Sequence, residues 1–238
     1  MTYKLYYWPD IPGRGEFVRL ALEEVGAPYH DVARSKAGMA EMMAMLEDER
    51  LTHPPFAPPF LVDGDLIIGQ TAAILLHLGD RHGLAPKTKK GRLWVHQLQL
   101  TIADTVAEAH DAHHPVGVEL YYEDQKPEAL RRAKSFREHR IPKFLRWFDA
   151  VLARNPKGNA YLVGASVSYA DLSLFQLIEG LRYAFPRRMK RCLDDMPNLL
   201  AHRGLIAGRP RIEAYLASER RLPFNEDGVF RHYPELDG

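Results

Sequence analysis

The first part of the chain alternates between strand-like and helix-like patterns of apolar residues. Residues 3–8 (YKLYYW) are aromatic and extended in character, and a loop rich in proline and glycine follows them. Apolar residues then recur at helical spacing over 16–26, where Gly26 supplies a C-terminal stop. A second short strand is expected over 29–33, so the pattern predicts a βαβ unit.

The pattern continues with a helix, a shaped loop, a hairpin and a further helix. Residues 36–50 are rich in methionine and predict a helix, whereas the proline-dense segment 53–59 can form neither a helix nor a central strand. Two apolar triplets around an Asp-Gly-Asp turn predict a hairpin over 60–68, and helical periodicity returns over 71–82. The predicted order of elements is βαβαββα.

The remainder of the chain is predicted to be helical. Residues 83–90 are polar and turn-forming, so we place a linker there, between a domain at 1–82 and a second domain at 91–238. Beyond this linker a strand is expected only around 160–163. Helical patterns cover four segments: 93–112, 127–153, 169–183 and 197–218. The predicted fold class is an α/β domain followed by an all-α helical bundle.

Composition and charge narrow the class of partner. The 238 residues include 46% apolar and 26% charged side chains, and the formal net charge is only +1. A balanced charge gives no global field towards nucleic acid or anionic membrane, so small molecules are the expected partners. The single cysteine, Cys192, excludes an internal disulfide, and no segment approaches the roughly 18 apolar residues of a membrane span. We therefore expect a cytoplasmic protein with neither nucleic-acid nor membrane partners.

Three local motifs, taken in their order along the chain, carry a resemblance to a known family. YKLYYW at 3–8 is followed by GRGEFVR at 13–19, PPFLVDG at 58–64 precedes QTAAI at 70–74, and SYADL stands at 168–172. With the predicted order of elements, they make nearly the whole chain resemble a cytosolic glutathione transferase. Such proteins join a thioredoxin-like domain to a helical one, and the N-terminal part here is similar to the sigma-like classes. The resemblance implies glutathione as co-substrate and a homodimer.

Glutathione transfer needs a thiolate, and a thiol with a free pKa of roughly 8.5 ionises poorly at neutral pH. One hydroxyl that donates to the sulfur is worth about 1.5–3 kcal/mol, or about one to two units of pKa. Similar proteins place a Tyr or Ser at the end of the first strand, where this chain has Tyr7; its first serine is Ser35. The resemblance therefore implies Tyr7 as the activating hydroxyl and Arg14 as a nearby cation. Arg19 is expected to be an ion-pair partner within the fold.

The resemblance also assigns residues that would bind glutathione. Pro59 matches a cis proline whose loop pairs with the cysteinyl backbone, and Pro58 before it departs from the family because it has no N–H to contribute. Gln70 and Thr71 stand where the third helix begins, and free N–H groups at such an end suit the γ-glutamyl carboxylate. A plain helix N-cap pair is the alternative for these two residues. Trp8 is a further candidate contact.

The helical part adds a candidate dimer contact and a face for the second substrate. Asp104 resembles an aspartate that reaches the γ-glutamyl amine in the partner subunit, and an exposed helix aspartate is the alternative. The second substrate would lie between Trp8, the loop 9–12 and the helix face around His110 and His114. These histidines suit a metal ion, but no further ligand motif accompanies them, so we expect no metal.

Three functions are compatible with these residues. The favoured function is attack by the glutathione thiolate on an apolar electrophile. The same thiolate could serve glutathione-dependent isomerisation or peroxide reduction, and the sequence does not separate these reactions. The third function is that of a non-catalytic protein that binds glutathione or apolar ligands; Tyr7 argues against it, and Pro58 argues mildly for it.

Overall fold

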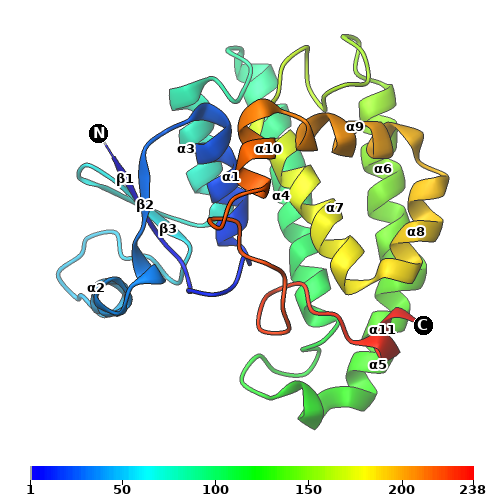
Figure 1. Cartoon of the computed structure of the whole chain (residues 1–238), viewed down its shortest axis with the longest axis horizontal. Coiled ribbons are helices and arrows are strands. Elements are labelled where there is room, and N and C mark those ends of the chain that lie inside the picture. Colours follow the sequence, from blue (N-terminus) through cyan, green and yellow to red (C-terminus); the bar gives the residue numbers. More distant parts are fainter. Residues whose placement is uncertain (1) are drawn as a thin grey trace.

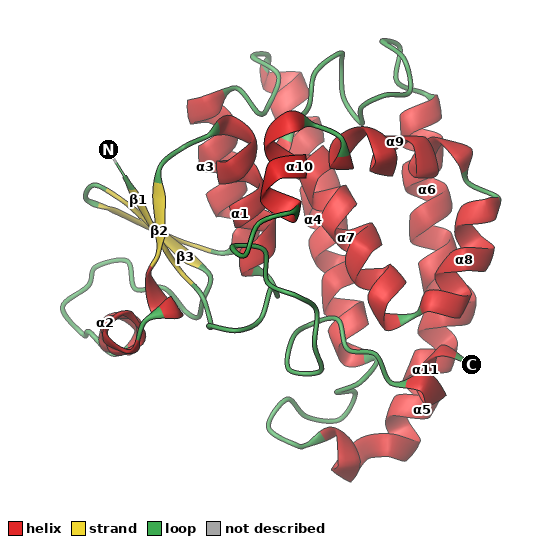
Figure 2. Cartoon of the chain, viewed as in Figure 1, coloured by secondary structure: helices red, strands yellow, loops and turns green. Residues whose placement is uncertain are grey.

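A four-stranded mixed sheet organises the N-terminal part of the chain in the computed structural model, which describes residues 2–238 (Figure 2). The strands follow the order β2-β1-β3-β4, with β1 parallel to β2 and β3 antiparallel to both of its neighbours. Their bounds are β1 Tyr3–Tyr6, β2 Tyr29–Asp31, β3 Phe60–Asp63 and β4 Leu66–Gly69. Leu5 pairs with Asp31 on one side and Leu61 on the other, so β1 is an interior strand.

Helices cover both faces of this sheet (Figure 1). The helices α1 (Gly15–Val25) and α3 (Thr71–His82) pack on one face, and α2 (Lys36–Leu46) packs on the other. Alternation along β1 divides the core between the faces. Leu5 joins the cluster of α1 and α3, whereas Tyr6 packs with Met42 of α2 and stacks on Phe60.

The rest of the chain is helical, as predicted, and its helices gather around a buried central one. Their bounds are α4 Lys89–Asp111, α5 Lys126–Ser135, α6 Ile141–Ala153, α7 Tyr169–Ala184, α8 Pro186–Asp194, α9 Pro197–Ala207, α10 Pro210–Leu216 and α11 Pro234–Asp237. Shorter turns are η1 Val32–Arg34, η2 Tyr122–Gln125 and the π-helical turn η3 Phe136–Arg140. Helix α7 lies in the middle, between α4 and α6 (Figure 1). Within residues 2–238 no helix has both the length and the apolar character to cross a membrane.

The sequence prediction of a strand around 160–163 is wrong, and side-chain hydrogen bonds explain why. The backbone N–H of Leu162 donates to Asp171 at 2.7 Å, and the amide of Asn155 donates to the carbonyls of Tyr161 and Gly164, both at 2.8 Å. The same Asp171 closes a capping box with Ser168 at the start of α7. Because these side chains take up the backbone groups, the segment is a fixed loop.

Two predicted helices are interrupted, and two helices, α8 and the short α11, have no counterpart in the sequence prediction. The segment 127–153 contains α5, the π turn η3 and α6, and the segment 197–218 contains α9 and α10 on either side of Gly208. Helix α8, which begins at Pro186, was not predicted. Its four basic residues make its average composition strongly polar, and only one face is apolar.

Candidate active site

Tyr7 follows β1 directly and is buried, with 3% of its surface exposed. Two glycines of the next loop lie against its ring. A Cβ atom on Gly13 would lie 2.1 Å from the Tyr7 hydroxyl, and one on Gly15 would lie 2.6 Å from its Cγ atom. Gly13 also has a positive φ of 43°, which side chains disfavour. The two glycines therefore allow the loop to close over the Tyr7 ring.

The hydroxyl of Tyr7 is held as an acceptor. It accepts the backbone N–H of Arg14 at 2.8 Å, and among the described residues it donates to no acceptor. Burial raises the pKa of Tyr7, while the Arg14 N–H and the charges of Arg14 and Arg19 partly oppose that effect. The phenol is therefore protonated at neutral pH, and its own proton is uncommitted.

The side chain of Arg19 holds the loop between β1 and α1 in place. Its guanidinium lies 5.8 Å from the centre of the Tyr7 ring and is fully buried. It donates to the carbonyl of Pro12 at 3.2 Å and forms ion pairs with Glu16 at 3.1 Å and Asp31 at 2.7 Å. The sequence prediction of an ion-pair partner is confirmed.

A cavity of about 340 Å³ opens beside Arg14, between the start of α3 and the middle of α4. Its lining comprises Arg14, Phe17, Gln70, Thr71, Ala72, Ala73, His96, Gln99, Leu100, Ile102, Ala103 and Val106. Three buried polar atoms on these side chains, Thr71 Oγ1, His96 Nδ1 and Gln99 Oε1, have no hydrogen-bond partner in residues 2–238. Leaving such groups unpaired is costly, so a bound ligand that reached them would gain hydrogen bonds.

The start of α3 adds further donors to this cavity. No side chain of residues 2–238 caps the start of helix α3, so the N–H groups of its first turn donate to no side chain and can donate to a ligand. Gln70, just before it, has a φ of 64° and a ψ of 119°, an uncommon backbone conformation for a residue other than glycine. The free N–H groups and the positive end of the helix dipole suit a carboxylate.

The other predicted site residues lie outside the lining of this cavity. The Pro58–Pro59 peptide is cis, with Pro59 buried just before β3. Trp8 packs against the Tyr6 cluster on the α2 side, and Asp104 is exposed on α4. Of the predicted residues, Arg14, Gln70 and Thr71 line the cavity, and Tyr7 adjoins it through its hydrogen bond to the Arg14 N–H; the four other predicted residues do not line it.

The histidines at the end of α4 are packed together. The Nδ1 atoms of His113 and His114 lie 2.5 Å apart, and His113 Nε2 donates to the carbonyl of Val229 at 2.9 Å. Burial is the main cause that lowers the pKa of His113 to about 3 and that of His114 to about 4. Both rings are therefore neutral at neutral pH. No cluster of three or more potential ligands suited to a metal ion occurs in the described part of the chain.

Comparison with known proteins identifies the family. The model of the glutathione S-transferase C-terminal domain matches residues 110–219. A Mus musculus protein, glutathione S-transferase Mu 3, is 30% identical over 228 residues, which are 94% of each chain. The chain belongs to the glutathione S-transferase family. Its curated relatives are glutathione S-transferases, and the chain is an enzyme of this class.

Further relatives agree over the whole length. The Bos taurus glutathione S-transferase P is 28% identical over 95% of this chain and 98% of its own. The solved Pi-class glutathione S-transferase of Onchocerca volvulus superposes with a TM-score of 0.73 at 24% identity, covering 96% of this chain and 99% of the other. The latter likeness is one of fold, and it agrees with the predicted thioredoxin-like and helical parts.

Two polar residues that line the transferase cavity were not predicted from the sequence. Gln99 lies on the buried face of α4 with Val95, Leu98 and Ile102, and it is 1% exposed. A single amide on an otherwise apolar helix face was the available signal. His96 precedes it by three residues, but nothing in its local sequence distinguishes it from a packed histidine.

Proposed function

We propose that this transferase activates glutathione by donating the hydroxyl proton of Tyr7 in a hydrogen bond to the sulfur. The observation that carries the proposal is the state of that hydroxyl: its acceptor side takes the Arg14 N–H at 2.8 Å, and its proton has no acceptor in the described residues. A charge-assisted bond of this kind is worth about 1.5–3 kcal/mol. It would lower the pKa of the bound thiol by about one to two units from roughly 8.5, so that a large fraction of it is thiolate at neutral pH.

Arg14 strengthens the same effect through its charge. Its guanidinium borders the cavity and forms no ion pair with any residue in 2–238. An unneutralised cation close to the sulfur favours the anionic form. Arg14 thus acts twice, because its backbone N–H orients Tyr7 and its side chain stabilises the thiolate.

The cavity would hold the γ-glutamyl end of glutathione. Its carboxylate would accept from the Thr71 hydroxyl and from the free N–H groups at the start of α3, with Gln70 beside them. The loop at Pro58 and Pro59 would hold the cysteinyl part through the Pro58 carbonyl, with Trp8 nearby. In this assignment residues 1–82 form the glutathione-binding domain, 83–90 the linker and 91–238 the helical domain.

A homodimer would complete the site. Several large apolar side chains are exposed. Among them are Leu100, which lines the cavity and is 47% exposed, and Phe56, which lies on the loop between α2 and β3 and is 94% exposed. Such exposure is typical of a surface that a second copy covers. Asp104, also exposed on α4, would then reach the γ-glutamyl amine bound in the partner subunit. Sedimentation should give a dimer, and the Asp104→Ala variant should bind glutathione more weakly; a fully active monomer would contradict this arrangement.

The reaction is nucleophilic attack by the thiolate on an apolar, electrophilic carbon. The thiol proton passes to solvent when glutathione binds, the new carbon–sulfur bond forms from the sulfur lone pair, and the leaving group departs with its electron pair. Tyr7 keeps its own proton throughout, which is consistent with its raised pKa.

Calorimetry in two buffers of different ionisation enthalpy tests this proposal. Glutathione should bind at neutral pH and release a large fraction of a proton per site, because its thiol ionises. S-methylglutathione, which has no thiol, should bind with no such release. Binding of glutathione without proton release would contradict the proposal.

A further inference from the structure

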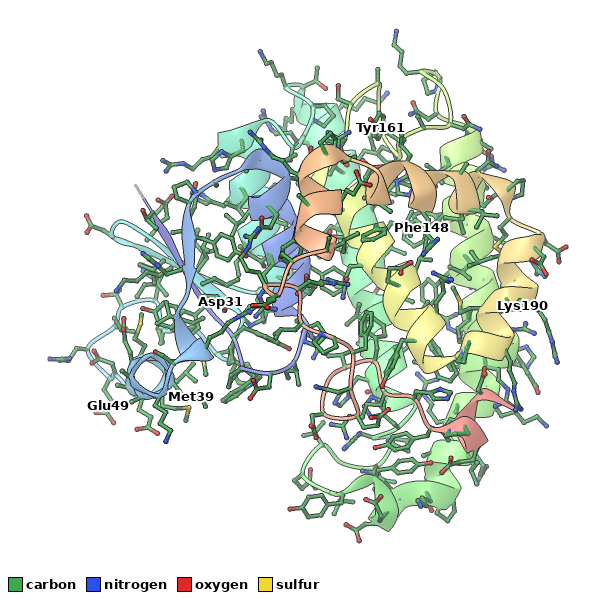
Figure 3. The ribbon with its side chains drawn as sticks, in the orientation of Figure 1. Asp31, Met39, Glu49, Phe148, Tyr161 and Lys190 are labelled. Atoms are coloured by element: carbon green, nitrogen blue, oxygen red, sulfur yellow. The ribbon has the colours of Figure 1, made fainter. Side chains whose placement is uncertain are left out.

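A second hollow, of about 190 Å³, lies between the π turn η3, helix α8 and the end of the described chain. Its lining comprises Arg137, Glu138, Arg187, Arg188, Arg191, Asp237 and Gly238. Helices α8 and α11 lie at the side of the molecule remote from the sheet (Figure 1), and Lys190 of α8 lies at the same edge (Figure 3). This arginine pocket is therefore separate from the cavity beside Tyr7.

The four arginines of the pocket outnumber its two carboxylates. None of them forms an ion pair with a residue in the described range, whereas Arg19, Arg140 and Arg209 each do so elsewhere. The carboxylate of Asp237 accepts the backbone N–H groups of Arg187 at 2.8 Å and Arg188 at 3.1 Å. Asp237 is thus engaged at the start of α8, and the exposed Glu138 is the other acid in the lining.

One donor in the pocket is buried without an acceptor. The Nε atom of Arg188 has no hydrogen-bond partner among the residues described. Arg137 gives one N–H to the carbonyl of Leu236 at 2.6 Å, and Arg187 gives one to the carbonyl of Gly238 at 3.4 Å. Each guanidinium carries five N–H donors, so most of the donors on these side chains are not accounted for by these bonds.

The backbone that carries Arg137 is itself unusual. Residues Phe136–Arg140 form a π-helical turn between α5 and α6, a conformation that is rare and often found at functional sites. Arg140, on the same turn, forms a bidentate pair with Glu108 at 2.7–3.0 Å. Of the two arginines on this turn, Arg140 therefore forms an internal ion pair and Arg137 lines the pocket.

We propose that the arginine pocket binds a phosphate group, either as free phosphate or as the monoester of a small molecule. Like charges gathered in a hollow repel one another unless a counter-ion joins them. Guanidinium groups match phosphate oxygens in paired hydrogen bonds, and a dianion with several acceptor oxygens can pair with more than one arginine. The volume is below the roughly 300 Å³ at which pockets for drug-sized ligands begin, so it suits a small anionic group.

Calorimetric titration of the full chain with inorganic phosphate, at constant ionic strength in a buffer without phosphate, tests this proposal. We expect saturable binding at one site per chain. Arg191→Gln should weaken it by about tenfold or more, because a charge-assisted bond is lost. Arg137→Gln should do the same, although it also removes the bond to Leu236. The matched control is Arg131→Gln on α5, an exposed arginine outside the pocket, which should bind phosphate like the native chain.

Parallel titrations decide the chemistry of the ligand. A titration with glycerol phosphate distinguishes the two ligand forms. Tighter binding of inorganic phosphate would indicate the free anion, and tighter binding of glycerol phosphate would indicate a monoester. Acetate should bind much more weakly, and equal binding of acetate would overturn the assignment to phosphate. No saturable heat with millimolar phosphate, or equal weakening in Arg131→Gln, would also overturn it.

A purely structural role of the arginines gives a different result. If the cluster only holds the last described residues in place, Arg137→Gln will lower the melting temperature, and phosphate will not change that difference. Glutathione affinity should be unchanged in all three variants, so this test is independent of Tyr7.

Discussion

Tyr6 and Tyr7 are neighbours in the sequence, but they lie on opposite faces of the sheet, and their hydroxyl groups are in different states. The hydroxyl of Tyr6 faces α2 and donates to the carboxylate of Glu41 at 2.5 Å. Burial, and then the bond to that carboxylate, raise the pKa of Tyr6, so its proton stays bound and engaged. The hydroxyl of Tyr7 instead accepts from Arg14 and has a proton to give.

The comparison indicates which property separates the two tyrosines. Both phenols are protonated at neutral pH, and both side chains are almost fully buried. They differ in whether the protein has already used the donor. The carboxylate of Glu41 in α2 accepts the proton of the Tyr6 hydroxyl in a hydrogen bond, whereas a loop N–H orients the Tyr7 hydroxyl and leaves its proton free.

Replacing Tyr7 should have the largest effect on the reaction. Tyr7→Phe removes the one donor proposed for the sulfur and leaves the ring in place. The value of kcat/KM for glutathione at neutral pH should fall by about 10- to 100-fold, because a charge-assisted bond of about 1.5–3 kcal/mol is lost. Initial-rate kinetics with an activated aryl halide would measure this. If Tyr7→Phe keeps an activity within twofold of the native value, the Tyr7 hydroxyl is not the activating donor.

Displacing the Tyr7 ring should have the next largest effect. In Gly15→Ala the new Cβ would lie 2.6 Å from Cγ of Tyr7, so the ring or the helix must move. Overpacking of this kind costs about 1–3 kcal/mol, and we expect both a lower melting temperature and about a tenfold loss of turnover. The matched control is Gly204→Ala in α9, where an added Cβ meets nothing within 4 Å. That variant should be as active as the native enzyme and no less stable; equal losses in both variants would contradict the specific role of Gly15.

Thr71→Val should separate binding of glutathione from its ionisation. The change removes the buried hydroxyl of a residue that lines the cavity but keeps the side-chain shape. Glutathione affinity should fall by about three- to tenfold, the usual range for one hydrogen bond, while the pKa of the bound thiol stays as in the native enzyme. Calorimetry and absorbance would measure these two quantities. An unchanged affinity would show that this end of the cavity does not hold glutathione.

Tyr6→Phe should have the smallest effect and serves as the control for Tyr7→Phe. It removes the bond to Glu41, which is partly exposed, so the free energy of unfolding should fall by about 1 kcal/mol or less. Turnover should stay within about twofold of native, because this hydroxyl faces away from the cavity. Denaturant unfolding and the same kinetic assay would measure both. A loss of turnover as large as that of Tyr7→Phe would contradict the account.

Much of the fold was predictable because it depends on local patterns. Extended, turn-forming and helical patterns placed the sheet and the helices around it, and the helical pattern over 169–183 located α7 correctly. The prediction failed where distant side chains decide the backbone. Asp171 takes the N–H of Leu162 and prevents the expected strand, and the apolar side of α8 is recognisable only once Met189 and Cys192 are seen to be buried.

The site was predictable only in part, for a related reason. Arg14, Gln70 and Thr71 follow motifs at the ends of elements and line one cavity, and Tyr7 is bonded to the backbone of Arg14 at its border. His96 and Gln99 enter the same cavity from α4, and no local signal connects that helix with the start of α3. The orientation of the Tyr7 hydroxyl also depends on a loop N–H that a sequence pattern does not reveal.

The near-ultraviolet absorbance of the glutathione thiolate, titrated against pH on the enzyme, tests the central claim most directly. The native enzyme and Tyr6→Phe should give the same pKa for the bound thiol, well below the free value of roughly 8.5. In Tyr7→Phe that pKa should rise by about one to two units, as expected for the loss of one charge-assisted hydrogen bond. An unchanged pKa in Tyr7→Phe, with glutathione still bound, would contradict the account.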